Sequence, residues 1–243
     1  MAETGSTNSD LAQAAQAEAG EIVLVADHQT AGRGRLDRTW EAPAGASLLM
    51  SVLVRPGSGT AAMSFIPMAL GLAACDSIRR VGGVAVGLKW PNDVVAAEGS
   101  ALDRKLGGML SEVGSSEAGP FVVAGLGVNL NRPGGFEGEL RTSATAIDLM
   151  GGAADREELV VELLRGFETN LASVRDEAGR RSLRANYASE CVTLGRRVRV
   201  ELGGDEVVGT AVDVDDELAL KVESDDRSVV TVRTGDVVHL RPA

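Results

Sequence analysis

The pattern of apolar residues changes near residue 190, and this change constrains the fold more than any other feature. Before it, apolar runs long enough for buried strands alternate with segments of helical periodicity. From Arg196 onward, short alternating segments are separated by glycine and aspartate, which is typical of a small all-β module. The 243 residues suffice for one large and one small domain. We therefore predict an α+β domain over residues 1–190 and a small β-barrel over residues 195–243.

The larger predicted domain should contain helices packed against a sheet. Helical length and apolar spacing predict helices at residues 9–19, 63–83 and 156–179. Short apolar runs predict buried strands at residues 21–27, 47–56, 84–90, 105–113 and 121–130. The sequence contains no internal repeat and no low-complexity stretch, and the alternation of helices and strands indicates an α+β fold.

Composition and charge argue against several classes of protein. The formal net charge of −11 disfavours nucleic acid as the main partner, because phosphate backbones are bound by basic surfaces. No uninterrupted apolar run reaches the roughly 18 residues of a membrane span, and the N-terminus lacks the basic and apolar regions of a signal peptide. Cys75 and Cys191 form no CxxC pair, which predicts buried, reduced thiols in a cytoplasmic protein.

A glycine- and arginine-rich stretch, QTAGRGRLDRTW (29–40), is locally basic in this acidic chain. It holds Arg33, Arg35 and Arg38, and a glycine precedes each of the first two. Arginine binds phosphate or carboxylate through a planar pair of donors, and glycine lets backbone N–H groups approach a ligand. Taken alone, the stretch fits either a phosphate-binding loop or a solvent-exposed turn.

Four other stretches could add polar groups to the same site. They are GSTN (5–8), LKWPNDVV (88–95), KLGGMLSEV (105–113) and GLGVNLN (125–131). Each also has a simpler interpretation, as a helix N-cap, a hairpin turn, a closely packed strand or a strand end. Their order and spacing are more specific than any one of them.

Together, STN, QTAGRGR, KWPND, KLGGML and GLGVN closely resemble the biotin protein ligase family, in family order and with similar spacing. The resemblance covers residues 4–240 and implies a mixed β-sheet with packed helices, as in class II synthetases and lipoate ligases, followed by an SH3-like barrel. It implies that biotin and ATP react in the presence of Mg²⁺ to give biotinyl-5′-AMP and pyrophosphate. Biotin is then transferred to a lysine of a biotin carboxyl carrier domain. The family resemblance leaves open whether the protein is a monomer or a homodimer.

The resemblance also implies roles for individual residues. Those matched to the biotin site are Ser6, Thr7, Asn8, Gln29, Arg33, Gly34, Arg35 and Lys105. Those matched to ATP or the adenylate are Arg33, Arg35, Arg38, Trp40, Lys89, Asn129, Asn131 and Arg241. Catalytic roles fall to Lys105 and Arg33, which face the reacting carboxylate and phosphate, and to Asp93, which accepts a proton from the incoming lysine. No metal ligand is assigned.

The sequence departs from the family pattern in three places. Asp37 stands where many members have glycine, and it adds a negative charge to the arginine-rich loop. The segment between Asp93 and Lys105 is several residues longer than in well-known members and is expected to form a surface hairpin. The chain begins almost directly at STN, so we expect no helix-turn-helix before it and no repressor role.

Alternative functions use the same residues differently. A lipoate–protein ligase would share the fold and the adenylate chemistry, but the combination of KWPND and GRGR favours biotin. A non-catalytic biotin or nucleotide sensor would have a degenerate site, whereas Lys105, Asp93 and the three arginines are all present. An α+β binding protein without catalytic activity is the simplest remaining alternative.

Overall fold

A six-stranded sheet forms the centre of the larger part of the molecule. The computed structural model describes residues 1–56, 62–132, 134–202 and 205–240. The sheet contains, in spatial order, β2 (Ile22–Ala26), β4 (Ser47–Val54), β8 (Gly119–Asn129), β7 (Lys105–Ser116), β6 (Asp93–Ala96) and β5 (Val86–Lys89). Neighbouring strands pair antiparallel throughout. A separate parallel pair, β1 (Glu3–Thr4) with β3 (His28–Gln29), makes the strand pairing mixed.

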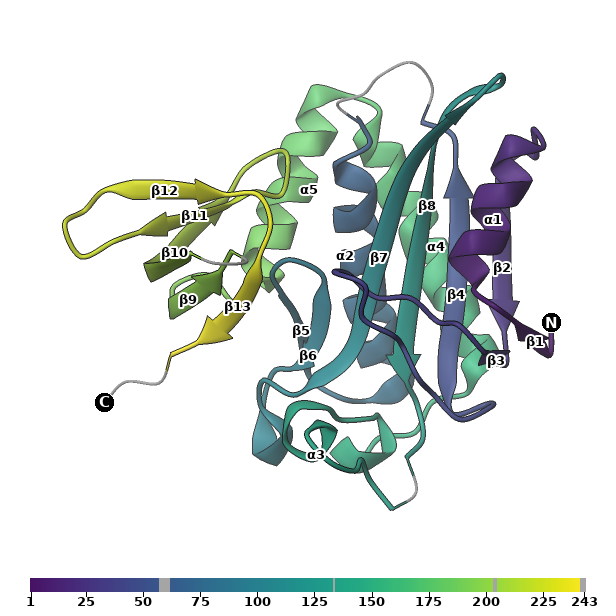
Figure 1. The fold of residues 1–243 in the computed structure, drawn as a ribbon, viewed down its shortest axis with the longest axis horizontal. Coiled ribbons are helices and arrows are strands. Elements are labelled where there is room, and N and C mark those ends of the chain that lie inside the picture. The colour runs from purple at the N-terminus through teal and green to yellow at the C-terminus, as the bar shows by residue number, and fades with distance from the viewer. Residues whose placement is uncertain (57–61, 133, 203–204, 241–243) are drawn as a thin grey trace.

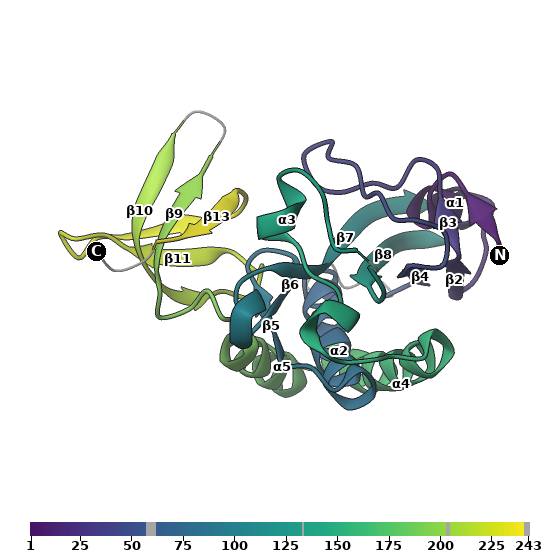
Figure 2. The same ribbon diagram turned by 90° about the horizontal axis from the view of Figure 1, so that it is seen from below.

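The two faces of this sheet are covered unequally. Figure 2 shows α2 (Phe65–Gly82), α4 (Arg156–Val174) and α5 (Glu177–Glu190) on one side of it, and α1 (Thr7–Gln16) on the other. The three-helix side holds the main core, and α2 lies at its centre because its residues are apolar nearly all round. A smaller core joins Leu11 and Ala15 of α1 to Phe121 and Val123 of β8. Among the described helices, none combines the length and apolar character needed to cross a bilayer.

The C-terminal residues form a second, smaller sheet. Its antiparallel strands are β12 (Val229–Val232), β11 (Leu220–Glu223), β10 (Glu206–Val214), β9 (Arg197–Glu201) and β13 (Asp236–His239), in spatial order. The inward-facing residues are small and β-branched, and several valines are fully buried. Figure 1 shows this sheet at the left, next to α5 and the β5–β6 hairpin. Its arrangement is consistent with the SH3-like module predicted from the sequence.

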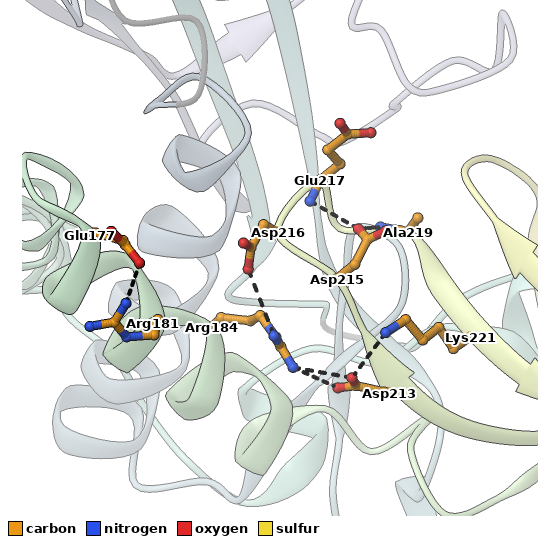
Figure 3. Close-up of polar contacts among 9 residues, drawn as sticks. All are labelled: Glu177, Arg181, Arg184, Asp213, Asp215, Asp216, Glu217, Ala219 and Lys221. Atoms are coloured by element: carbon orange, nitrogen blue, oxygen red, sulfur yellow. Dashed lines mark hydrogen bonds and ion pairs between the residues drawn. The ribbon is translucent and has the colours of Figure 1, made fainter.

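Ion pairs and one buried tryptophan attach the small sheet to the rest of the chain. Arg184 of α5 lies between Asp213 and Asp216, as Figure 3 shows, with 3.1 Å between Nη2 and the nearer Asp213 Oδ2. Trp90, just after β5, is only 1% exposed, and its indole N–H donates to the carbonyl of Leu218 at 2.6 Å. Trp90 is therefore a packing residue between the two sheets.

The structure corrects one predicted helix. Residues 156–179 do not form a single helix, because α4 ends at Val174 and α5 begins at Glu177. The carboxylate of Asp176 accepts the backbone N–H of Gly179 and so caps a new helix. Residues 172–178 contain neither glycine nor proline, so the sequence carries no strong signal for this break. Helix α2 ends as expected, at Gly83 in the left-handed region with φ +67°.

The segment between Asp93 and Lys105 forms the expected hairpin. Strand β6 begins at Asp93 and pairs antiparallel with β7, and a short 3-10 turn at Gly99–Ala101 lies in their connection. Residues 94–96 were not predicted as a separate strand. Their run of two valines and one alanine is too short for a helix and is fully explained by burial in the sheet.

Candidate active site

A cavity of about 490 Å³ lies between the open face of the large sheet, the arginine-rich loop and the small sheet. Most of the residues predicted for the site line it. They are Ser6, Thr7, Asn8, Gln29, Arg33, Gly34, Arg35, Arg38, Trp40, Lys89, Asp93, Lys105 and Asn129. The lining holds five cationic side chains and four carboxylates in a chain of net charge −11. The site thus concentrates positive charge where the rest of the molecule is acidic.

Neutral polar side chains from three elements meet at the α1 end of the cavity. The backbone N–H of Thr7 donates to Gln29 Oε1 at 2.8 Å, and the Thr7 hydroxyl lies 2.7 Å from Ser51 Oγ. Ser51 in turn donates to Asn8 Oδ1 at 2.6 Å. Gly125 leaves room for this arrangement, because a Cβ there would lie 2.2 Å from Asn8 Oδ1. Thr7, Asn8 and Ser51 are buried and Gln29 is half-buried, and their network suits an uncharged polar ligand group.

The arginine-rich loop folds as a tight hairpin against the cavity. Arg33 and Thr39 form an antiparallel bridge, and the backbone N–H of Trp40 donates to the Gly32 carbonyl at 2.9 Å. The turn at its tip places Leu36 at φ +54° and Asp37 at φ +57°. Two successive left-handed residues are typical of a turn that favours glycine, which gives a physical reason for the glycine that many family members have at position 37.

Two arginines of this loop contact the small sheet. Arg35 Nη1 donates to the Asn92 amide oxygen at 3.1 Å, and its Nη2 lies 3.3 Å from the Thr234 hydroxyl. Arg38 forms an ion pair with Asp236, the first residue of β13. Burial lowers the pKa of Arg35, and the charge of Asp236 opposes that shift. The loop therefore contacts both sheets.

Glycines on β7 and β8 make space for an aromatic ring and a lysine inside the cavity. A Cβ on Gly127 would lie 2.7 Å from the Trp40 ring, and one on Gly108 would lie 3.0 Å from Lys105 Nζ. Lys105 Nζ is 5.7 Å from the centroid of the Trp40 ring. Among the described residues, the Trp40 indole N–H is one of two buried side-chain donors or acceptors without a partner. This N–H faces β8, since a Cβ on Gly127 would lie 3.1 Å from the indole nitrogen.

Lys105 and Asp93 form a direct ion pair. The distance between Lys105 Nζ and Asp93 Oδ1 is 2.7 Å. Asp93 is the first residue of β6 and Lys105 is the first residue of the neighbouring strand β7. The spacing of the motifs brought these residues to one site, but only the strand pairing shows that they touch. A ligand anion that approaches Lys105 must share the ammonium group with Asp93.

Three of the predicted residues differ from the others in what the structure shows of them. Asn129 lines the cavity, but its amide is already used, since Nδ2 donates to the Thr145 carbonyl at 3.0 Å and Oδ1 accepts from Ser47. Asn131 is exposed and lies outside the cavity lining. Arg241 lies outside the described residues. In the described part of the chain, no three His, Cys, Asp or Glu side chains gather into a metal-binding group.

Several polar residues at the site were not singled out from the sequence. Glu112 of β7 accepts from Asn8 Nδ2 at 2.9 Å and pairs with Arg33. Ser51 is the one polar residue within the buried stretch 48–54, and this irregularity is a signal that sequence reasoning could have used. Asp236 of β13 carried no comparable signal, because its contact with Arg38 depends on how the two sheets meet.

Solved structures of biotin protein ligases share this fold. The chain superimposes on the Aquifex aeolicus biotin protein ligase in complex with biotin and ATP with a TM-score of 0.78 and 25% identity. The match covers 100% of this chain and 97% of that one. Together with a cavity lined by cations at one end and neutral polar groups at the other, this likeness defines a ligase of the biotin and lipoate class.

Sequence comparison then assigns the family. Residues 3–129 match the Biotin/lipoate A/B protein ligase family, and residues 193–240 match the Biotin protein ligase C terminal domain. The chain is 44% identical to the biotin–[acetyl-CoA-carboxylase] ligase of Mycobacterium tuberculosis, over 99% of this chain and 88% of that protein. It is 30% identical to the bifunctional ligase/repressor BirA of Escherichia coli, over 90% of this chain and 66% of that protein. The chain therefore belongs to the biotin protein ligase family.

Proposed function

We propose that this chain is an ATP-dependent biotin–protein ligase. It would form biotinyl-5′-AMP from biotin and ATP, and then transfer biotin to a lysine of the biotin carboxyl carrier domain of an acyl-CoA carboxylase. The observation that carries the proposal is the single cavity in which the STN segment, the arginine-rich loop, Lys105 and β13 meet. The relatives named above support the choice of biotin over lipoate.

The distribution of charge along the cavity suggests where each substrate lies. Thr7, Asn8 and Gln29 offer neutral donors and acceptors at the α1 end, which suits the ureido group of biotin. Lys89 and Arg38 line the part next to β13, which suits the phosphates of ATP. Figure 1 shows α1 and β13 on opposite sides of β7, so the reacting ends of the two substrates would meet in between.

The first chemical step brings a carboxylate to a polyphosphate, and charge repulsion is the main obstacle. Biotin's carboxylate oxygen attacks the α-phosphorus, and pyrophosphate leaves with the bonding electron pair. Lys105 and Arg33 both line the cavity. Preorganised cations that face developing charge are commonly worth about 3 kcal/mol each. We assign this role to Lys105 and Arg33.

The second step needs a neutral amine, whereas a free lysine is protonated at neutral pH. The incoming lysine attacks the acyl carbon of the adenylate, and AMP leaves. Asp93 lines the cavity and is the carboxylate that we propose accepts the proton of this lysine. Because Asp93 is paired with Lys105, movement of Lys105 toward the substrate anions would free the carboxylate for the second step.

Mg²⁺ would arrive with ATP as part of the substrate. Magnesium in nucleotide sites keeps water and phosphate oxygens as ligands and uses only one or two protein carboxylates. Asp236 is a cavity carboxylate of that kind, and it is paired with Arg38. We propose residues 1–190 as the catalytic domain and residues 195–243 as the SH3-like domain. We also propose a cytoplasmic location, which fits the two free thiols.

A biotin incorporation assay tests the proposal directly. The full chain is incubated with biotin, Mg²⁺, ATP and a purified carrier domain, and biotin on the carrier is measured by mass spectrometry. We expect a gain of one biotin only when ATP is present, and pyrophosphate release with biotin and ATP alone. Incorporation of lipoate in place of biotin, or the absence of pyrophosphate release, would contradict the proposal.

A further inference from the structure

We propose that Asp103, Arg196 and His239 form a positioning cluster that fixes the ATP side of the cavity. This inference rests on the proposed function. The cluster joins the β6–β7 connection, the segment before β9, and β13. These three segments are far apart in the sequence, and none of the three residues lines the cavity itself. They would act through two segments that do: the turn after β5, and β13.

Asp103 lies in the connection between β6 and β7, two residues before β7 begins. Its carboxylate accepts two contacts from Arg196 Nη1, at 2.7 Å to Oδ1 and 2.8 Å to Oδ2. Each side chain is about one third exposed, at 35% for Asp103 and 34% for Arg196. The backbone holds Asp103 in place, since its N–H donates to the Ala96 carbonyl at 3.0 Å. Asp103, near the end of this connection, thus forms an ion pair with the residue that precedes the small sheet.

His239 continues the cluster into the interior. Its side chain is 8% exposed, and Nδ1 lies 3.1 Å from Arg196 Nη1. The same Nδ1 lies 3.4 Å from Asp103 Oδ1. On the other side of the ring, Nε2 lies 3.2 Å from the Thr193 hydroxyl. Both ring nitrogens of His239 are therefore in contact with polar partners.

Thr193 carries the cluster to the cavity wall. Its hydroxyl oxygen also accepts the backbone N–H of Trp90 at 3.1 Å, and Thr193 is fully buried. Trp90 is followed by Pro91, Asn92 and Asp93, all of which line the cavity. The chain of contacts from Asp103 therefore ends on the backbone of the turn that presents Asp93.

The same cluster holds β13, the other wall at this end of the cavity. His239 is the last residue of β13, and Asp236, Val237 and Val238 of that strand line the cavity. Asp236 pairs with Arg38 of the arginine-rich loop. Fixing His239 against Thr193 thus sets the distance between β13 and the turn after β5. ATP phosphates would lie between these two walls, whereas the biotin end is built from α1, β3 and β4.

The test compares Asp103→Asn with wild type in pyrophosphate release by the full chain. Asparagine keeps the shape of aspartate but loses the charge that holds Arg196. We expect the KM for ATP to rise about 10-fold, within the range that small misplacements of reacting groups produce. The KM for biotin should stay unchanged. Asp103→Glu keeps the carboxylate and should restore most of the affinity for ATP.

Asp225→Asn is the matched control. Asp225 forms an ion pair with Arg197, the neighbour of Arg196, on the exposed side of the small sheet, with 2.7 Å between Oδ1 and Nη1. This variant should leave both KM values unchanged. Thr193→Val breaks the contact with Trp90 and should raise the KM for ATP as Asp103→Asn does.

The measurements distinguish a failure of the positioning role from a failure of the proposed ligase function. A KM for ATP within two-fold of wild type in Asp103→Asn overturns the positioning role, and so does an equal rise in both KM values. If the wild-type chain releases no pyrophosphate, the proposed function fails instead. The two failures cannot be confused, because the first requires an active wild-type enzyme.

Discussion

Arg33 and Glu112 form an ion pair across the rim of the cavity, with 2.9 Å between Nη1 and Oε1. The other oxygen of Glu112 accepts from Asn8 at 2.9 Å. One carboxylate thus connects the arginine-rich loop to the STN segment and, through Ser51 and Thr7, to Gln29. Glu112 does not line the cavity, so it acts on a ligand only through these neighbours.

Removing the charge of Glu112 should loosen the loop over the adenylate. The pair is partly exposed, and such pairs contribute about 0.2–1 kcal/mol. We therefore expect Glu112→Gln to speed dissociation of biotinyl-5′-AMP about two- to five-fold. Glu112→Ala should have a larger effect, because Asn8 also loses an acceptor. Stopped-flow measurement of adenylate release tests this, with Glu117→Gln in the β7–β8 turn as control. Wild-type release rates in Glu112→Ala would contradict it.

Lys105 and Asp93 should separate the two steps of the reaction. Without the Lys105 ammonium, the carboxylate and phosphate approach without a counter-charge, so Lys105→Ala should slow adenylation by about 100-fold or more. Asp93→Asn should retain adenylation within about ten-fold and slow transfer to the carrier much more. Single-turnover assays measure the steps apart, the first by pyrophosphate and the second by transfer from preformed biotinyl-5′-AMP. Equal losses in both steps for both variants would refute the assignment.

Asp37 should tolerate glycine but not a β-branched residue. Its φ of +57° lies in the left-handed region, which costs most L-residues about 1–2 kcal/mol. Asp37→Gly removes this strain but adds freedom to the unfolded chain, so the free energy of unfolding should change by less than about 1 kcal/mol. Asp37→Val should be less stable than wild type by about 1–2 kcal/mol. Urea denaturation compares the three proteins, and an equally stable Asp37→Val would show that the turn does not hold this geometry.

The sequence predicted most of the site because its motifs are local and chemically distinctive. The order of STN, GRGR, KWPND and KLGGML identifies which side chains can serve biotin and ATP, and the fold brings nearly all of them to one cavity. What it could not predict are contacts that depend on strand register, such as Lys105 with Asp93. It also could not predict contacts between the two sheets, such as Arg38 with Asp236.

The incorrect single helix has a similar physical cause. Apolar residues at helical spacing end at Val174, but residues 172–178 contain neither glycine nor proline, so the predicted helix continues to Gly179. The break depends on Asp176, which is an ordinary surface residue in the sequence and a helix N-cap in the structure. Asn131 was predicted to lie at the site but is exposed and outside the cavity lining. An amide at a strand end can face solvent as well as a ligand, so the sequence could not decide between the two.

The two cysteines should be unreactive in the folded protein. Both are buried and free, and burial raises the pKa of Cys75 to about 12 and also raises the pKa of Cys191. At pH 8 only about 1 in 10⁴ of the Cys75 thiols would be ionised, and the thiolate is the reactive form. We expect no modification by iodoacetamide in buffer and two modified cysteines in urea, as read by mass spectrometry. Rapid modification of the native protein would contradict the predicted burial.

His239 should make stability depend on pH. Burial, with the charges of Lys89 and Arg196, lowers the pKa of His239 below its usual value of about 6.5, and Asp103 opposes this shift. In the window below pH 6.5 the unfolded chain binds a proton that the folded chain does not, so stability rises with pH there. The free energy of unfolding in urea should therefore fall between pH 7.5 and 5.5. His239→Gln should reduce the fall, because glutamine does not titrate. An identical pH dependence in wild type and His239→Gln would contradict this prediction, because it would show that His239 titrates alike in the folded and unfolded chains.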